Sequence, residues 1–420
     1  MRLQTRNNPF IAMAGLYLVV GAIALLGKIL GEAGGVTTVP RIRWTAIHFV
    51  TIGAVTQALF GVLPAFLAGT TPPTATGDQT ARWLQWLSLN AGFPFILLGM
   101  VTGRTVTASV GAVLVLVALG GLIRTVYGLE SDSDSTRYFR TALWYLVVGI
   151  LAALGMLLNV HGPGGYFGSI EAHVHANAWG FIAITVAGVL LGVLPRLFEA
   201  DLAYPRLRAP VYWGLTVGAA GLVAGPWLAL DAVTVAGLGA YVVGTATLLA
   251  TVIGTYRRSD RSQQKRLALV LGAYLWLLFP VPWAPLILLY PETVPGAAIE
   301  LAAIDGLVFG WMLQLAVAFL PLVATASKTD IQALPEAIGA TSRTVREPTW
   351  LQIGSLNAGV GVLWLAAIPR LAPVATELTV GGYLLIAVGW VLFLADFWAA
   401  LILSDDRPAT PGSPPEGRRG

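Results

Sequence analysis

Residues 171–198 read EAHVHANAWGFIAITVAGVLLGVLPRLF. This apolar run begins with His173 and His175 and ends with Pro195 and Arg196. About 20 apolar residues suffice to cross a bilayer as a helix. Ionisable groups at the mouth of such a helix are candidate ligands. The stretch therefore predicts a membrane-spanning helix with a binding function at one end.

The rest of the chain repeats this pattern. Of its 420 residues, 56% are hydrophobic and 11% are charged, with a mean hydropathy of +0.75. Because lipid offers no partners to backbone polar groups, such runs must be helices. We therefore expect an all-α polytopic membrane protein with twelve transmembrane helices, at about 10–32, 43–68, 83–102, 105–127, 138–160, 172–195, 208–229, 232–256, 266–290, 300–324, 350–372 and 378–404.

The distribution of charge predicts the orientation in the membrane, and the cysteine content excludes several kinds of site. If the N-terminus is inside, the inner segments hold 20 of the 25 Lys and Arg residues. This bias predicts a multi-pass protein of the cell membrane with both termini cytoplasmic. The net charge of +4 then reflects loop orientation, so the expected partner is the lipid bilayer and not nucleic acid. With no cysteine, disulfides, thiolate metal sites and iron–sulfur clusters are excluded.

Internal repeats organise the chain. WLQWLSLNAG at 83–92 and WLQIGSLNAG at 350–359 share eight of ten residues. YLVVG occurs at 17–21 and 145–149, with Tyr274 in the corresponding place of the ninth helix. The anchors predict three parallel four-helix repeats, at about 1–127, 138–256 and 266–404. They form a single transmembrane domain, 1–404, which is followed by a disordered cytoplasmic tail, 405–420.

The second, sixth and tenth helices can be aligned on Pro64, Pro195 and Pro321. His48 and Asp305 then share one position, which Trp179 occupies in the sixth helix, with His175 one turn further out. His173 and His175 cannot both face one site, because two residues rotate a helix by about 200°. The alignment predicts a site at the outer ends of these three helices, and the fourth histidine, His161, lies in an outer loop.

In this layout the chain resembles the heme–copper oxidase subunit I superfamily. The run HVHANAWGF at 173–181, with its GVLP ending, is similar to segments of the cbb-type oxidases and of NnrS-type heme–copper membrane proteins. The resemblance implies heme b or copper as cofactors, and other respiratory subunits or a small electron carrier as partners. It also implies a role in electron transfer, in gas handling (oxygen or nitric oxide) or in respiratory assembly, with any catalysis an oxidoreductase reaction of this type.

The chain departs from that family in its histidines. A complete oxidase of this type uses six, whereas this chain has four, so a complete terminal oxidase is excluded. His48 matches a ligand position of the low-spin heme, and Asp305 stands where the tenth helix would supply a heme-binding histidine. The expected site residues are therefore His48, His175, Arg41 and Arg43 for a cofactor, with the arginines holding heme propionates, and His173, His175 and Asp305 for a metal.

Two alternatives remain open from the sequence. The scaffold could serve as a transporter or channel, with a polar path through Asp305, Gln57 and Gln314. It could also be a structural subunit without a cofactor. For each histidine, the alternative to a ligand is a neutral, hydrogen-bonded side chain inside the helical bundle or at its boundary with water.

Overall fold

The computed structural model describes residues 8–36, 39–67, 79–129, 134–260, 263–290, 292–326 and 334–403. Every regular element in these segments is a helix. The predicted tail, 405–420, lies outside the described residues, as do the last residues of the predicted spans 43–68 and 378–404. The helices are α1 (Pro9–Glu32), α2 (Ile42–His48), η1 (Phe49–Thr56), α3 (Gln57–Leu67), α4 (Gln79–Thr102), α5 (Thr105–Gly128), α6 (Thr136–Leu157), α7 (Gly165–His175), η3 (Ala176–Ile182), α8 (Ala183–Leu197), η4 (Pro205–Leu207), α9 (Arg208–Leu228), α10 (Asp231–Arg257), α11 (Gln264–Leu278), α12 (Trp283–Leu289), α13 (Gly296–Asp305), η5 (Gly306–Met312), α14 (Leu313–Ala326), α15 (Leu334–Thr341), α16 (Trp350–Ala366), η6 (Pro369–Val374) and α17 (Ala375–Leu403).

The prediction of a polytopic helical membrane protein is confirmed. Eleven helical segments of the described chain are long and apolar enough to cross a membrane. They match eleven of the twelve predicted spans, and the remaining one, 350–372, is the shorter helix α16. Its predicted end was wrong because Pro369 disfavours helical backbone in the residue before it, and Ile368 is extended.

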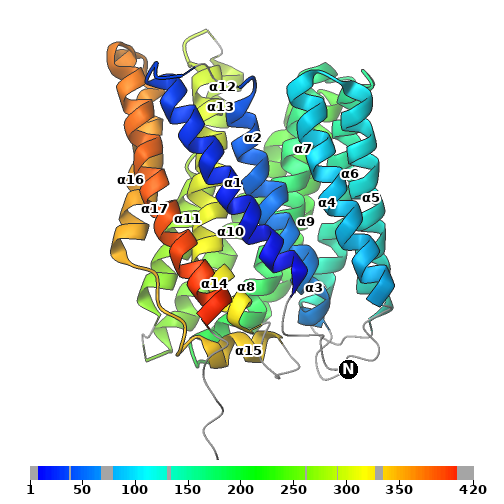
Figure 1. Cartoon of the computed structure of the whole chain (residues 1–420), viewed down its shortest axis with the longest axis vertical. Coiled ribbons are helices and arrows are strands. Elements are labelled where there is room, and N and C mark those ends of the chain that lie inside the picture. Colours follow the sequence, from blue (N-terminus) through cyan, green and yellow to red (C-terminus); the bar gives the residue numbers. More distant parts are fainter. Residues whose placement is uncertain are drawn as a thin grey trace, which may run out of the picture.

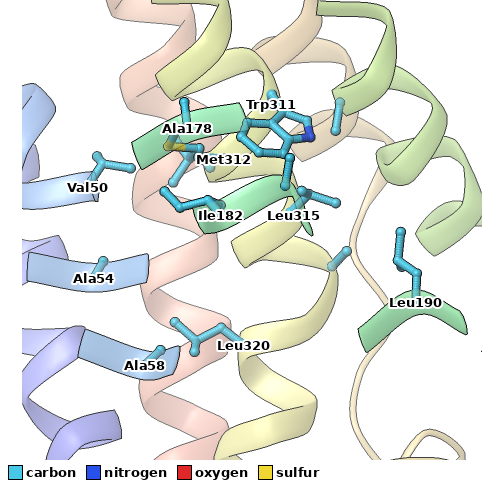
Figure 2. Packing of buried hydrophobic residues seen from close by; sticks show 14 of the residues in the cluster. Val50, Ala54, Ala58, Ala178, Ile182, Leu190, Trp311, Met312, Leu315 and Leu320 are labelled. Atoms are coloured by element: carbon cyan, nitrogen blue, oxygen red, sulfur yellow. The ribbon is translucent and has the colours of Figure 1, made fainter. Parts of the chain in front are cut away.

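Three continuous segments form the centre of the bundle. In Ile42–Leu67, Gly165–Leu197 and Gly296–Ala326 the most apolar stretch is 67%, 72% and 89% buried, against 28–44% in the other spanning segments. Figure 2 shows side chains from all three meeting in one apolar core, among them Val50, Ala178 and Met312. The other helices bury one face and leave apolar side chains such as Val117 and Val243 exposed, as expected of a surface that faces lipid.

Each central segment contains a π-helix at a corresponding place. The segments η1, η3 and η5 begin directly after His48, His175 and Asp305. A glycine follows each of these three residues at the fifth position and packs against an aromatic ring of the preceding spanning helix. A Cβ there would lie 2.8 Å from Tyr17 at Gly53, 2.4 Å from Tyr145 at Gly180 and 2.6 Å from Trp276 at Gly310.

These glycines correct two predicted correspondences. His175, and not Trp179, occupies the position that His48 and Asp305 share. The alignment on prolines failed because Pro195 lies twenty residues after His175, whereas Pro64 and Pro321 lie sixteen residues after their counterparts. In the ninth helix, Trp276 stands where Tyr274 was expected.

Peripheral helices pair as tight hairpins. The pairs α4–α5, α9–α10 and α16–α17 each make extensive contacts. A Cβ on Gly92 would lie 2.7 Å from the carbonyl oxygen of Gly111, and one on Gly359 would lie 2.7 Å from that of Gly382. Both glycines close the repeated WLQ motif, so the motif marks a close approach of two backbones. Small residues allow such approaches between helices in lipid.

The first and last helices complete the bundle. Helix α1 packs against α17, and a Cβ on Gly15 would lie 2.2 Å from the ring of Phe397. Figure 1 shows these two helices side by side, with the start of α1 and the end of α17 at the same end of the molecule as α15. The starts of α2, α7 and α13 lie at the opposite end, which we call the outer end.

Candidate functional site

His48 ends α2 and is only half buried although it belongs to a central segment. Its Nδ1 lies 2.8 Å from the backbone carbonyl oxygen of Trp44. The imidazole also stacks on the Trp44 indole, with ring centroids 3.8 Å apart and planes 31° apart. The ring is therefore held in one orientation from within its own helix.

His173 and His175 reach two different neighbours. Nδ1 of His173 lies 2.8 Å from the carbonyl oxygen of Gly149 in α6, and Nδ1 of His175 lies 2.8 Å from that of Leu222 in α9. The prediction that the two rings diverge is confirmed. His48 and His173 are close enough to interact electrostatically, whereas the pairing of His48 with His175 stays a prediction.

The three rings share one hydrogen-bonding arrangement. A backbone carbonyl can only accept, so the proton of each neutral ring lies on Nδ1 and the lone pair on Nε2. Asn177 Nδ2 also lies 3.1 Å from Nδ1 of His173, but this amide donates to the His173 carbonyl oxygen at 2.7 Å. No described residue forms a hydrogen bond with Nε2 of His48, His173 or His175. An imidazole whose Nδ1 is held by a carbonyl is oriented to ligate through Nε2.

His161 differs from these three. Its Nε2 lies 3.1 Å from Asn159 Oδ1 and its Nδ1 lies 3.4 Å from Ser169 Oγ, and its ring packs edge-on against Tyr166. Both nitrogens thus have partners, one in the outer loop and one in the first turns of α7. His161 has the geometry of a structural histidine, in line with its predicted place at the boundary.

Asp305 takes part in a buried ion pair. Arg43 Nη2 donates to Oδ1 at 3.0 Å and to the carbonyl oxygen of Leu301 at 2.8 Å, while the Tyr383 hydroxyl donates to Oδ2 at 3.0 Å. The side chain of Asp305 is 7% exposed and that of Arg43 is 24% exposed. The structure therefore places this carboxylate in an ion pair with Arg43.

The two arginines have separate surroundings. Arg43 links α2 to α13 through Asp305, whereas Arg41 is exposed and reaches Met100 Sδ at 3.8 Å. Arg41 also has a left-handed backbone, with φ 60°, at the cap of α2. The guanidinium of Arg43 is therefore already neutralised by a carboxylate of this chain, while Arg41 keeps its charge at the outer rim.

The residues of the predicted polar path are not joined. Gln314 is fully buried and exchanges hydrogen bonds with Asn357, whose Oδ1 also accepts from Trp276 Nε1 at 2.8 Å. Gln57 is also buried, and its Nε2 has no partner among the described residues. No described hydrogen bond connects either glutamine to Asp305, so these contacts lend no support to the transport alternative.

Sequence reasoning missed Tyr383 and Asn357. Tyr383 lies in α17, and nothing in its sequence context distinguishes it from an interfacial tyrosine. Asn357 lies in the repeated WLQ motif and joins α16 to its neighbours through hydrogen bonds with Gln314 and Trp276. Among the described residues, no group of three or more His, Asp and Glu side chains is close enough to hold a metal ion.

The residues present do not fit the complete heme–copper ligand set. In the tenth predicted span, the position where that family has a heme-binding histidine is occupied by Asp305, which ends α13 and pairs with Arg43. They do fit a smaller group that needs one or two imidazoles, since three Nε2 atoms are oriented and without a described hydrogen bond. No protein-family model matches this chain, and no curated protein is similar enough to it to count as a relative.

Proposed function

We propose that this integral membrane protein binds a heme near its outer end through Nε2 of His48, with His173 as the second ligand. The observation that carries the proposal is the shared arrangement of the three imidazoles, each fixed at Nδ1 by a backbone carbonyl. A histidine that is only packed has no need of a free and oriented Nε2, whereas a ligand does. When bound, the heme supplies a redox-active iron.

A heme suits this ligand inventory better than a copper or zinc ion. A haem iron takes one or two axial ligands from the protein, because the macrocycle supplies the other four. A bare transition metal ion needs three or four protein ligands. His48 and His173 are close enough to interact electrostatically, and Asp305, the carboxylate that ends α13 as His48 ends α2, is taken by Arg43.

The role that fits one such group is electron transfer, binding of a diatomic gas, or assembly of a respiratory complex. The buried pair of Arg43 and Asp305 fills the position where the related architecture would hold a second ligand. Arg41, exposed at the outer rim, is then the cation available to a heme propionate, since bidentate contacts with carboxylates are typical of arginine.

We further propose that the fold consists of three four-helix repeats around a common axis. Support comes from the π-helices at corresponding places, from the glycine five residues after each of His48, His175 and Asp305, and from the three peripheral hairpins. In such a ring, each corresponding residue faces the next central helix. The pairing of Asp305 with Arg43 of α2, and the influence of His173 of α7 on His48, agree with this rule.

The test is a visible spectrum of the protein purified after expression with ample heme. We expect a Soret band, its loss in His48→Ala, and its weakening and shift in His173→Ala, because one axial ligand is removed. His161→Ala is the matched control and should leave the band unchanged, since both its nitrogens are already bonded, one to Asn159 and one to Ser169.

Two outcomes would contradict the proposal. The first is a wild-type protein with no Soret band and no iron by elemental analysis. The second is a band that His48→Ala leaves unchanged. If the band is unchanged in His173→Ala but shifts in His175→Ala, the protein binds heme and its second ligand is His175, not His173.

A further inference from the structure

A polar pocket lies at the inner end of the molecule, opposite the histidines. Its volume is about 580 Å³, and it is formed by the start of α11, the segment between α15 and α16, and the first residue of α16. Figure 1 shows α15 at this end of the bundle. The residues that determine its character are Gln263, Lys265, Arg343, Arg346, Glu347 and Trp350.

The lining carries three cations and one carboxylate. Lys265 lies 3.6 Å from Glu347, Arg343 lies 2.7 Å from Glu199, and Arg346 lies 3.5 Å from Asp396. The side chains of Arg343 and Arg346 are 71% and 74% exposed. Ion pairs this exposed contribute little free energy, typically less than about 1 kcal/mol. Both guanidinium groups can therefore turn to an incoming anion at small cost.

A buried cation lies directly behind this lining. Arg266 is 2% exposed, and its guanidinium donates to Gln263 Oε1 and to the carbonyl oxygens of Ala318 and Arg346. None of these acceptors is charged, and no described carboxylate forms an ion pair with Arg266. Glu347 acts on it only at longer range and is itself paired with Lys265. A buried charge without a counter-ion is costly, so an anion in the adjacent pocket would be stabilised.

The N-terminus of α16 adds to the positive potential of the pocket. This 17-residue helix begins at Trp350, which lines the pocket, and its capping box uses Thr349 and Gln352. The N-terminus of a helix carries partial positive charge and favours anions. Trp350 is 54% exposed, as is typical of tryptophan at the level of lipid headgroups.

We propose that this pocket binds a phosphate group, either from an anionic phospholipid of the inner leaflet or from a soluble phosphate compound. The argument is independent of the proposed heme. Arginine guanidinium groups match phosphate oxygens in a bidentate geometry, and basic pockets between helices at the inner interface suit anionic headgroups. The lipid source agrees with the interfacial position of Trp350.

The experiment compares the full-length protein in phosphatidylcholine nanodiscs with and without phosphatidylglycerol. We expect phosphatidylglycerol to raise the thermal unfolding midpoint, and the double variant Arg343→Gln/Arg346→Gln to lose most of this rise. The matched control is Arg206→Gln/Arg257→Gln, which removes the same charge from exposed residues that do not line the pocket, and which should keep the response. Arg343→Gln alone gives the same test should the double variant accumulate poorly.

A second arm adds inorganic phosphate to the protein in pure phosphatidylcholine. Stabilisation by phosphate that depends on Arg343 and Arg346 would identify a soluble phosphate compound as the source, whereas a response to phosphatidylglycerol alone would identify the lipid. The proposal is overturned if neither probe stabilises the protein, or if the pocket variant and the control respond equally.

Discussion

Two side chains bind the carboxylate of Asp305 inside the protein. Arg43 supplies the opposite charge, Tyr383 donates to the second oxygen, and the backbone of Leu301 engages the same guanidinium nitrogen. In an interior of low dielectric constant, each member depends on the others, because removing one leaves an uncompensated charge. The ion pair links α2 to α13, and the hydrogen bond from Tyr383 links both to α17.

The first prediction concerns this pair. Asp305→Ala and Arg43→Met should each destabilise the purified protein by about 3–5 kcal/mol, because each leaves a buried charge alone. The double variant should lose less than the sum of the two, and the difference is the coupling between the side chains. Thermal or denaturant unfolding in detergent measures all three.

An exposed ion pair provides the control. Glu336 and Arg196 lie 2.6 Å apart with side chains 44% and 45% exposed, so Glu336→Ala should change stability by less than about 1 kcal/mol. Additive losses in Asp305→Ala and Arg43→Met would mean that the two side chains do not act as a pair.

At the scale of the element, the three π-helical segments are the most unusual local structures of this chain. Such segments are rare and often occur at functional sites. Each one starts directly after a polar residue, and a glycine within it lets the aromatic ring of the preceding helix approach the backbone. The widened turn and the missing side chain together bring the two helices close at the level of the candidate site.

The second prediction tests this close approach. Gly180→Ala should destabilise the protein by about 1–3 kcal/mol, because its Cβ would lie 2.4 Å from the Tyr145 ring and would force the helices apart. If heme is bound, its Soret band should also shift, since His173 and His175 belong to the same segment. Unfolding in detergent and the visible spectrum measure the two effects.

The control for Gly180 is Gly239, an exposed glycine inside α10 with nothing within 4 Å of an added Cβ. Gly239→Ala should be neutral or should stabilise the protein by up to about 1 kcal/mol, since alanine favours helix over glycine. Equal effects of the two substitutions would refute the role assigned to the glycine in η3.

For the whole molecule, the bundle has two chemically different ends. The outer end carries the four histidines and the ion pair of Arg43 and Asp305. The inner end carries the start of α1, the end of α17, α15 and the basic pocket (Figure 1). This division follows from helices that cross completely and from a bias of Lys and Arg toward one side.

The third prediction concerns the orientation of these ends. The chain has no cysteine, so single cysteines can be labelled without background. In intact cells, a membrane-impermeant maleimide should label Glu292→Cys at the outer end, and should label Arg343→Cys only after the membrane is opened. The reverse pattern would place the termini outside and the candidate heme site on the cytoplasmic side.

Much of the fold could be predicted from the sequence because the bilayer imposes simple rules. Apolar runs of sufficient length must become helices, and the loops carry the charge that orients them. The spans and the divergence of His173 and His175 were therefore predictable. The ion pair between Asp305 and Arg43 was not predicted, because nothing in the sequence links two residues so far apart along the chain.

Only the tertiary structure decided which groups meet. The sequence alone indicated that His48, His175 and Asp305 lie near the outer ends of three helices. It did not give the direction in which each side chain points around its helix, since the π-helical turns depart from the regular helical period. Arg43 and Tyr383 reach Asp305 across 262 and 78 residues. Such contacts depend on how helices rotate and pack, and in lipid this depends on the fit of side chains at the interface more than on hydrophobicity.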